Sequence, residues 1–311
     1  MQIYLPIAEI PINILWIISL GFITGILSGM FGIGGGFIAT PMLIFMGIPP
    51  LVAVATSANQ ITASSISGLL SHTKQKNVDF KMGFTLIFGG IFGSIIGIII
   101  FRMLQDMGQA DVFISIIYVI FLGFIGITMV IDNLRTILKE KYEIETRNKR
   151  KQRKLFIKFS KRLNKLPFKV YFPKSDVELS LIIPISIGVF AGSLVSMMGI
   201  GGGFVVVPAM IYILKMPHRV ITGTSLFQIV FIAVGVTVMQ SVVNNTVDIV
   251  LAAIMIIGSV IGVQFGIKKA KNMDSDSLKL LLAIMILLVC FKMFSQLFLE
   301  PTSLYNIEII K

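Results

Sequence analysis

The chain has 311 residues, of which 55% are hydrophobic and only 14% are charged, and its mean hydropathy is +0.92. Several apolar stretches of roughly 18 or more residues carry no charge, which is enough to cross about 30 Å of hydrocarbon. The composition therefore excludes an ordinary soluble domain and predicts an all-α integral membrane protein.

The net charge of +12 is concentrated in the middle of the chain, where fifteen of the 27 Lys and Arg residues lie between Arg135 and Lys174. Basic residues of multi-pass membrane proteins gather in cytoplasmic loops, so 135–178 is predicted to be a cytoplasmic loop. The alternative is contact of residues 135–174 with anionic lipid, because basic and apolar side chains interleave over 153–172 as on a surface-lying amphipathic helix. Nucleic acid is not a predicted partner.

Ten apolar segments follow one another along the chain, five on each side of the basic loop. They lie near 12–31, 35–48, 51–72, 82–103 and 112–134, and near 180–198, 204–214, 218–241, 247–267 and 278–298. We therefore divide the chain into a first membrane repeat at 1–134, the basic loop at 135–178 and a second membrane repeat at 179–311.

The same glycine-rich break interrupts an apolar run in each half. The sequence GMFGIGGGFIATP occupies 29–41 and SMMGIGGGFVVVP occupies 196–208, at an offset of 167 residues. The similarity continues beyond the breaks, since ATSANQI at 55–61 resembles GTSLFQI at 223–229. The glycines spaced by four at 89, 93 and 97 also match those at 258, 262 and 266. Such spacing lets membrane helices approach closely and predicts a packing face.

The basic residues outside the loop decide how the two halves are oriented. If each half crossed the membrane an even number of times, six basic residues would lie outside: Lys215, Arg219, Lys268, Lys269, Lys271 and Lys279. If each break instead makes a broken or re-entrant helix pair followed by three transmembrane helices, all six lie inside. We therefore predict two inverted repeats with about eight to ten membrane segments in the bacterial inner membrane, and both termini on the outer side.

Broken helices at corresponding positions of two inverted repeats point to the central site of a transporter. Segments 35–48 and 204–214 are short, about 21 Å and 17 Å long, so they are expected to start at the glycines and to face a shared midplane. The free N–H groups and positive dipole end of a helix start favour an anion, and glycine lets the ligand reach the backbone. The alternative role of these glycines is close helix packing.

Uncharged polar side chains beside the breaks complete the predicted site. Amides and hydroxyls can donate hydrogen bonds to an oxyanion, although polar contacts between helices are an alternative for each of them. The predicted substrate-binding residues are Gly32, Gly34, Gly35, Gly36, Thr56, Ser57, Asn59, Gln60, Gly199, Gly201, Gly202, Gly203, Thr224, Ser225 and Gln228. The three amides are the strongest candidates, because an unpaired amide is costly to bury.

Neither a metal, a cofactor nor an enzymatic reaction is predicted. No apolar segment carries a charged residue at its centre, so there is no obvious proton relay. Asp79 and Asp248 are related by the repeat and lie at segment starts, where helix capping is the expected role. His72 and His218 have no metal-ligand neighbours at suitable spacing, and the single cysteine, Cys290, excludes a disulfide framework.

The two GxGGG motifs followed by proline, each preceding a segment with a Thr-Ser pair (56–57 and 224–225), resemble the TauE/SafE family of sulfite and organosulfonate transporters. The resemblance covers nearly the whole chain except the central loop. It implies transport of sulfur-containing anions such as sulfite and sulfoacetate, often as export, and the glycines and Thr-Ser pairs match the family's recurrent pattern.

The leading hypothesis is a secondary transporter that moves a small sulfur-containing anion by alternating access. A passive anion channel with the same lining and a membrane scaffold acting through the basic loop are the alternatives. The expected partners are the small anion and the lipid bilayer, and a homodimer is left open.

Overall fold

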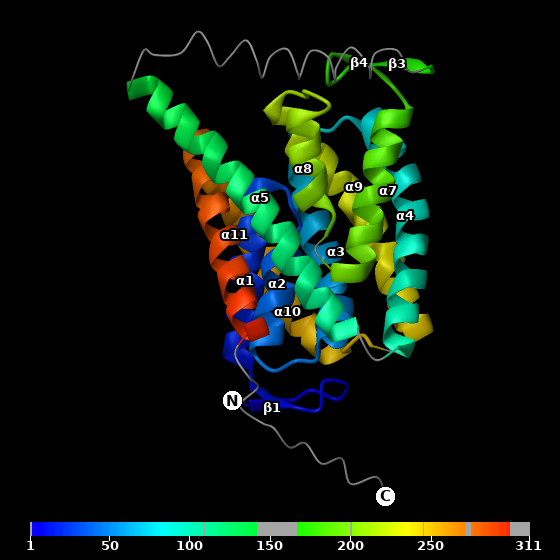
Figure 1. Ribbon diagram of the computed structural model, residues 1–311, viewed down its shortest axis with the longest axis vertical. Coiled ribbons are helices and arrows are strands. Elements are labelled where there is room, and N and C mark those ends of the chain that lie inside the picture. The colour runs from blue at the N-terminus through cyan, green and yellow to red at the C-terminus, as the bar shows by residue number, and fades with distance from the viewer. Residues whose placement is uncertain are drawn as a thin grey trace, which may run out of the picture.

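The helices of the protein stand side by side along the long axis of the molecule (Figure 1). The structure is a computed structural model that describes residues 2–107, 110–141, 167–199, 201–244, 246–270 and 275–298. Within these residues the chain forms ten α-helices and two short β-hairpins. The prediction of a predominantly helical membrane protein is confirmed.

The elements fall into two series of the same order, each a hairpin followed by five helices. The first series is β1 (Gln2–Tyr4), β2 (Pro11–Asn13), α1 (Ile14–Phe31), α2 (Gly36–Phe45), α3 (Pro50–Lys74), α4 (Phe80–Asp106) and α5 (Ala110–Lys141). The second is β3 (Lys169–Phe172), β4 (Val177–Ser180), α7 (Ile182–Met198), α8 (Gly203–Tyr212), α9 (His218–Met239), α10 (Ile249–Ala270) and α11 (Ser275–Phe298), with a π-helical turn at Gln240–Asn244 after α9.

Each of the ten apolar segments expected from the sequence is a helix. The helix α5 continues to Lys141, seven residues past the expected end of the first repeat at 134. Residues 142–166, most of the predicted basic loop, lie outside the described residues.

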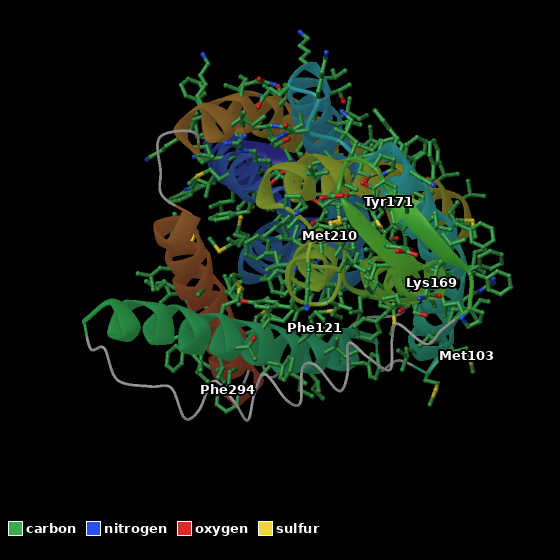
Figure 2. All side chains as sticks on the ribbon, turned by 90° about the horizontal axis from the view of Figure 1, so that it is seen from above. Met103, Phe121, Lys169, Tyr171, Met210 and Phe294 are labelled. Carbon is green, nitrogen blue, oxygen red and sulfur yellow. The ribbon has the colours of Figure 1, made fainter. Side chains whose placement is uncertain are left out.

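Two antiparallel β-hairpins precede the helices, and neither was predicted. In the first, Ile3 lies opposite Ile12, and in the second, Tyr171 lies opposite Glu178. The hairpins lie at opposite ends of the molecule (Figure 1), and Figure 2 looks down on the second one, with Lys169 and Tyr171 marking β3. The helix expected over 153–172 is wrong for residues 169–172, because this run of β-formers pairs with β4 and buries Phe172 completely. The rest of that stretch, to residue 166, lies outside the described residues.

Both glycine breaks end one helix and start another. The helices α1 and α7 end at Gly32 (φ +69°) and Gly199 (φ +64°), whose N–H groups donate to the carbonyls of Ser28 and Val195 at 2.8 Å. Positive φ is a conformation that glycine adopts without a steric penalty. The following helices α2 and α8 have only ten residues each, about 15 Å, so the expectation of two short helices is confirmed.

Glycines bring helices of the two halves into backbone contact. A Cβ atom added at Gly89, Gly93 or Gly97 of α4 would meet the backbone carbonyls of α7 (residues 185, 189 and 193). The counterparts at 258, 262 and 266 of α10 lie in the same way against carbonyls 18, 22 and 26 of α1. The predicted packing faces are therefore confirmed, and each joins a helix of one half to a helix of the other.

The outer surface of the helices is apolar. Four described stretches are long and apolar enough to cross a membrane: 14–31, 80–104, 219–242 and 249–270. Large apolar side chains are exposed along α4, α5, α10 and α11, for example Phe84, Phe124, Phe265 and Phe291. Such a surface would be unstable in water and fits contact with lipid chains.

Candidate functional site

The two glycine breaks lie directly against each other in the interior. A Cβ atom built on Gly34 would lie 3.5 Å from the carbonyl oxygen of Gly201, and one built on Gly201 would lie 3.3 Å from that of Ile33. At Gly203 a Cβ atom would lie 2.8 Å from the Cα of Ile33. The starts of α2 and α8 are therefore neighbours, as the repeat predicted.

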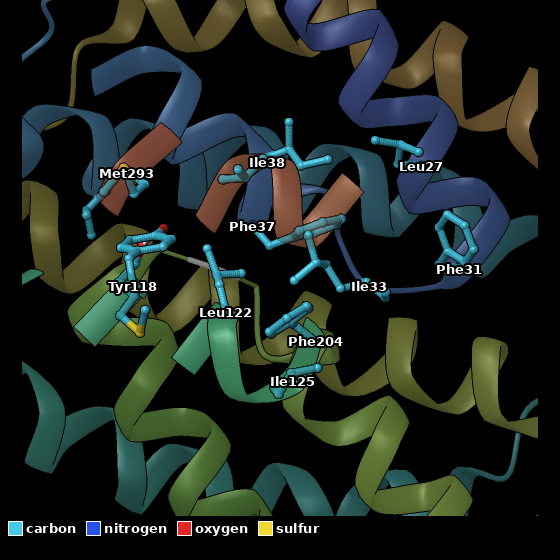
Figure 3. Close-up of a cluster of buried hydrophobic side chains, with 14 of the residues drawn as sticks. Leu27, Phe31, Ile33, Phe37, Ile38, Tyr118, Leu122, Ile125, Phe204 and Met293 are labelled. Carbon is cyan, nitrogen blue, oxygen red and sulfur yellow. Dashed lines mark hydrogen bonds between the residues drawn. The ribbon is translucent and has the colours of Figure 1, made fainter. Parts of the chain in front are cut away.

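Apolar side chains seal the contact between the breaks. Phe37 and Phe204, each the second residue of its short helix, stack with ring centroids 5.3 Å apart (Figure 3). Ile61 of α3 and Ile229 of α9 are fully buried and contact the glycines from the other helices. The side chains at the junction are apolar, and the polar side chains near the two helix starts lie at its flanks.

Hydroxyl groups tie each break to a helix of the opposite half. Ser225 of α9 donates a hydrogen bond of 2.8 Å to the carbonyl of Gly32. Thr40 of α2 donates one of 3.3 Å to the carbonyl of Gly199. The two carbonyls lie at the C-terminal ends of α1 and α7, where no N–H group of the same helix can donate to them. The hydroxyl groups supply the missing donors.

The threonines of the two Thr-Ser pairs contact two buried aspartates. The backbone N–H of Asp79 donates to the hydroxyl of Thr224 at 2.9 Å, and that of Asp248 donates to Thr56 at 3.1 Å. Each aspartate also caps its own helix, since Oδ1 accepts from Met82 N–H at the start of α4 and from Leu251 N–H at the start of α10. The expected capping role is confirmed, and the contact with the Thr of the other half adds to it.

Each hairpin is hydrogen-bonded to the aspartate of the opposite half. Oδ2 of Asp248 accepts from the N–H groups of Ile7 and Ala8 in the turn between β1 and β2. Oδ2 of Asp79 accepts from the hydroxyl of Ser175, in the turn between β3 and β4, at 2.5 Å. Sequence comparison of the halves missed these partners, because the hairpin sequences share no recognisable motif.

The two glutamines occupy corresponding places but have different surroundings. Gln60 of α3 donates through Nε2 to the hydroxyl of Thr24 at 3.4 Å. Gln228 of α9 is fully buried, and neither end of its amide has a hydrogen-bond partner among the described residues. Its Nε2 lies 3.8 Å from the position of a Cβ atom on Gly202, at the start of α8. An unpaired buried amide beside a helix start is the kind of group that a polar ligand would satisfy.

The structure brings the glycines of the two breaks together with Ser225, while Thr56 and Thr224 contact the aspartates on the sides of the two different hairpins. Of the fifteen predicted site residues, only Asn59 is not fully buried. The hydroxyls of Thr56, Thr224 and Ser225 are engaged with protein groups, whereas the Ser57 hydroxyl has no partner among the described residues. Thr24 was missed, because a single Thr in an apolar helix has no counterpart in the other half.

A separate cleft of about 710 Å³ lies away from the breaks, between α1, the end of α2 and α11. Its lining is mostly apolar and includes Trp16, Phe45 and Lys292, whose ammonium lies 5.2 Å from the centre of the Phe45 ring. It contains none of the predicted site residues. Among the described residues no group of three His, Cys, Asp or Glu side chains is arranged to hold a metal ion.

The fold and the buried site define a multi-pass membrane protein built around paired helix breaks. The family model described as Sulfite exporter TauE/SafE matches residues 17–293. The chain therefore belongs to the TauE/SafE family of membrane transporters.

Individual relatives agree with this assignment. The chain is 27% identical over 280 residues to the probable membrane transporter protein YjnA of Bacillus subtilis, covering 89% of this chain and 98% of the relative. It is 29% identical over 281 residues to the probable membrane transporter protein MJ0441 of Methanocaldococcus jannaschii, covering 86% and 90%. A shorter match, 29% over 126 residues, is to Sulfite exporter TauE/SafE family protein 3 of Arabidopsis thaliana, covering 38% and 26%. No solved structure matches the chain.

Proposed function

We propose that the protein is a secondary transporter that moves sulfite or an organosulfonate across the inner membrane by alternating access. The observation that carries the proposal is that the two glycine breaks pack directly against each other in the interior of the protein. The first N–H groups of α2 and α8 have no acceptor inside their helices, and of these the Gly203 N–H donates to the Gly201 carbonyl in the break itself. The positive ends of both helix dipoles lie where the nearest carboxylates, Asp79 and Asp248, already accept hydrogen bonds. An anion is the ligand that such helix starts favour.

The chemistry of the surrounding side chains supports an oxyanion. Gln60 and Gln228 bring neutral amide donors close to the helix starts, and the nearest carboxylates, Asp79 and Asp248, already accept hydrogen bonds from N–H and hydroxyl groups. Sulfite and sulfonates present several acceptor oxygens to such donors. The printed description of the matched family, a sulfite exporter, supports the same class of substrate.

The proposed mechanism uses two inverted repeats around this site. In support, the two hairpins that precede α1 and α7 lie at opposite ends of the molecule (Figure 1). The main helix contacts between the halves are also related by the repeat. Helix α1 of the first half packs on α10 of the second, and the corresponding α7 of the second half packs on α4 of the first. Ile61, Ile229 and the stacked phenylalanines form an apolar barrier. In this mechanism the barrier parts toward one side of the membrane at a time.

In the proposed orientation, the basic loop and the β3–β4 hairpin lie on the cytoplasmic side and both termini lie outside. The apolar belt of exposed side chains on α4, α5, α10 and α11 faces the lipid. This arrangement places Lys74, Lys76 and Lys81 with the central loop on the cytoplasmic side, as the positive-inside bias requires.

The test is ligand binding to purified protein in detergent, followed by thermal unfolding. Sulfite, sulfoacetate and taurine are compared with acetate and succinate as carboxylate controls. We expect sulfite or a sulfonate to raise the melting temperature in a saturable way, because a ligand that binds only the folded state stabilises it. Stabilisation by the carboxylates alone would remove the sulfur assignment, and stabilisation by no anion would remove the anion site.

A further inference from the structure

The two flanks of the paired breaks are not equivalent. In the first half, the Thr24 hydroxyl of α1 accepts a hydrogen bond from Gln60 Nε2, so that only the Gln60 amide oxygen is left without a partner among the described residues. The backbone of Thr24 also packs on Gly35, where a built Cβ atom would lie 2.5 Å from the Thr24 carbonyl oxygen. The offset of 167 residues places Ala191 at the position corresponding to Thr24. The second half therefore lacks the hydroxyl that pairs with the amide.

The surroundings of Gln228 also differ in the residues beside the amide. Its Nε2 lies 3.7 Å from the position of a Cβ atom on Gly90 of α4, a position that Cδ1 of the Ile232 side chain occupies. The residue of α10 that corresponds to Gly90 is Ser259. At Gly202, only two heavy atoms of described residues lie within 4 Å of a built Cβ: a methyl carbon of Val195 and Nε2 of Gln228. The flank with Gln228 thus has Ala191 and Gly90 at the positions that correspond to Thr24 and Ser259, and the neighbours beside the amide, Ile232 and Val195, are apolar and offer Gln228 no hydrogen bond.

From this asymmetry we infer that the transporter has one anion seat, on the Gln228 flank of the paired breaks, and that the Gln60 flank is a filled, structural counterpart. The inference rests on the proposed function and narrows it. The seat is formed by the Gln228 amide and by the start of α8 beyond Gly203, whose own N–H donates to the carbonyl of Gly201. Gly90 and Val195 lie beside it.

The ligand chemistry follows from the donors. Gln228 offers two N–H donors and no positive charge, and the start of α8 offers backbone N–H groups with the positive end of the dipole. A small oxyanion with at least two free oxygens, such as sulfite or the headgroup of a sulfonate, accepts from both at once. Since Gln228 is buried without a partner, the bound oxygen would replace a hydrogen bond that the empty protein lacks.

The first experiment measures the Kd of sulfite and sulfoacetate by isothermal titration calorimetry on the purified full chain. We expect Gln228→Leu to weaken binding at least about tenfold, the effect of losing a hydrogen bond to a charged group. Gln60→Leu should weaken it less than Gln228→Leu does. Thermal unfolding and size-exclusion profiles show whether each variant is folded.

A second pair of variants changes the flanks without touching the donors. Ala191→Thr copies the first half at the position that corresponds to Thr24. We expect its hydroxyl to pair with the Gln228 amide as Thr24 pairs with Gln60, and binding to be at least about tenfold weaker. The mirror variant Thr24→Ala should keep the Kd within about threefold of the wild-type value. If Gln228→Leu does not fold, the comparison of Ala191→Thr with Thr24→Ala tests the single seat without it.

The outcomes separate this inference from the proposed function. Wild-type protein that binds no sulfur oxyanion contradicts the proposed function and the inference with it. Normal binding that is weakened equally by Gln60→Leu and Gln228→Leu, or unchanged in Ala191→Thr, overturns the single seat and leaves the proposed function standing.

Discussion

At the scale of single residues, the corresponding glycines 35 and 202 lie in different surroundings although both have positive φ (+76° and +56°). Gly35→Ala would add a Cβ atom 2.5 Å from a backbone carbonyl oxygen, whereas Gly202→Ala would meet a side-chain methyl group at 2.9 Å. Both variants carry a cost of at least about 1–2 kcal/mol for an alanine with positive φ, and overpacking adds about 1–3 kcal/mol where the neighbour cannot move. We expect Gly35→Ala to lower the melting temperature more.

The same pair of variants should separate stability from binding. Gly202→Ala places a methyl group beside Gln228, so it should weaken sulfite binding while losing less stability than Gly35→Ala. Calorimetric titration and thermal unfolding of both proteins check this. Equal loss of stability in the two variants would show that the second break is packed as tightly as the first.

The sequence was sufficient to predict the two glycine breaks but not this difference. Repetition of GxGGG identified the eight glycines, and six of them have positive φ, a conformation that favours glycine. The state of the amides depends on Thr24 and Ala191, which lie in different helices from the glutamines. Such a contact between segments distant in sequence has no local pattern from which it can be predicted.

At the scale of elements, the helix pairs α1 with α10 and α4 with α7 depend on glycine contact. Gly93→Ala would push a methyl group into the Val189 carbonyl of α7, and Gly262→Ala would do the same at the Phe22 carbonyl of α1. Both should lower the melting temperature markedly, by the equivalent of about 1–3 kcal/mol or more. Gly235→Ala is the matched control.

The control glycine lies on α9 with no atom within 4 Å of a built Cβ and no positive φ. Alanine there should leave stability unchanged or raise it by about 0.5–1 kcal/mol, the difference in helix propensity. If Gly93→Ala and Gly262→Ala unfold at the same temperature as Gly235→Ala, the helices do not depend on glycine contact.

The buried aspartates join elements of the two halves. Thr56→Val and Thr224→Val remove the acceptors of the Asp248 and Asp79 N–H groups without changing side-chain volume much. Because each variant leaves a buried N–H group unpaired, we expect a loss of about 1–3 kcal/mol in unfolding experiments. Thr85→Val is a suitable control, since that hydroxyl bonds only within its own helix turn. If the three Thr→Val variants lost the same free energy of unfolding, the contacts with the aspartates would contribute no more than a hydroxyl bond within a helix turn.

Most elements were predictable and the hairpins were not. Apolar runs and glycine breaks define the ten helices, since membrane-length segments carry a strong periodic and compositional signal. The strands at 2–4, 11–13, 169–172 and 177–180 are only three or four residues long. They form because their turns bond to Asp79 and Asp248 of the opposite half, which is tertiary information.

At the scale of the whole molecule, the proposed orientation puts the two hairpins on opposite sides of the membrane. In a Cys290→Ala background, Glu9→Cys should react with a membrane-impermeant maleimide added outside intact cells. Asp176→Cys should react only after the membrane is opened. Labelling of both from outside would contradict the inverted topology.

The charge pattern predicted this orientation without any coordinates, because the positive-inside bias acts on loops and does not depend on packing. The closed state of the site could not be predicted in that way. The burial of all the predicted site residues except Asn59 results from the packing of the helices against one another, and the sequence indicates only that these residues are glycines or uncharged polar residues in apolar segments. A closed site is what alternating access requires in one of its states.

The most direct test of the account is counterflow of labelled sulfite in proteoliposomes loaded with unlabelled sulfite, with sulfoacetate as the second substrate. A carrier with a single seat should accumulate label transiently, in a saturable way, and Gln228→Leu should reduce this accumulation at least about tenfold at limiting substrate. Label that equilibrates without transient accumulation would identify a channel, and no flux of either anion would contradict the central claim.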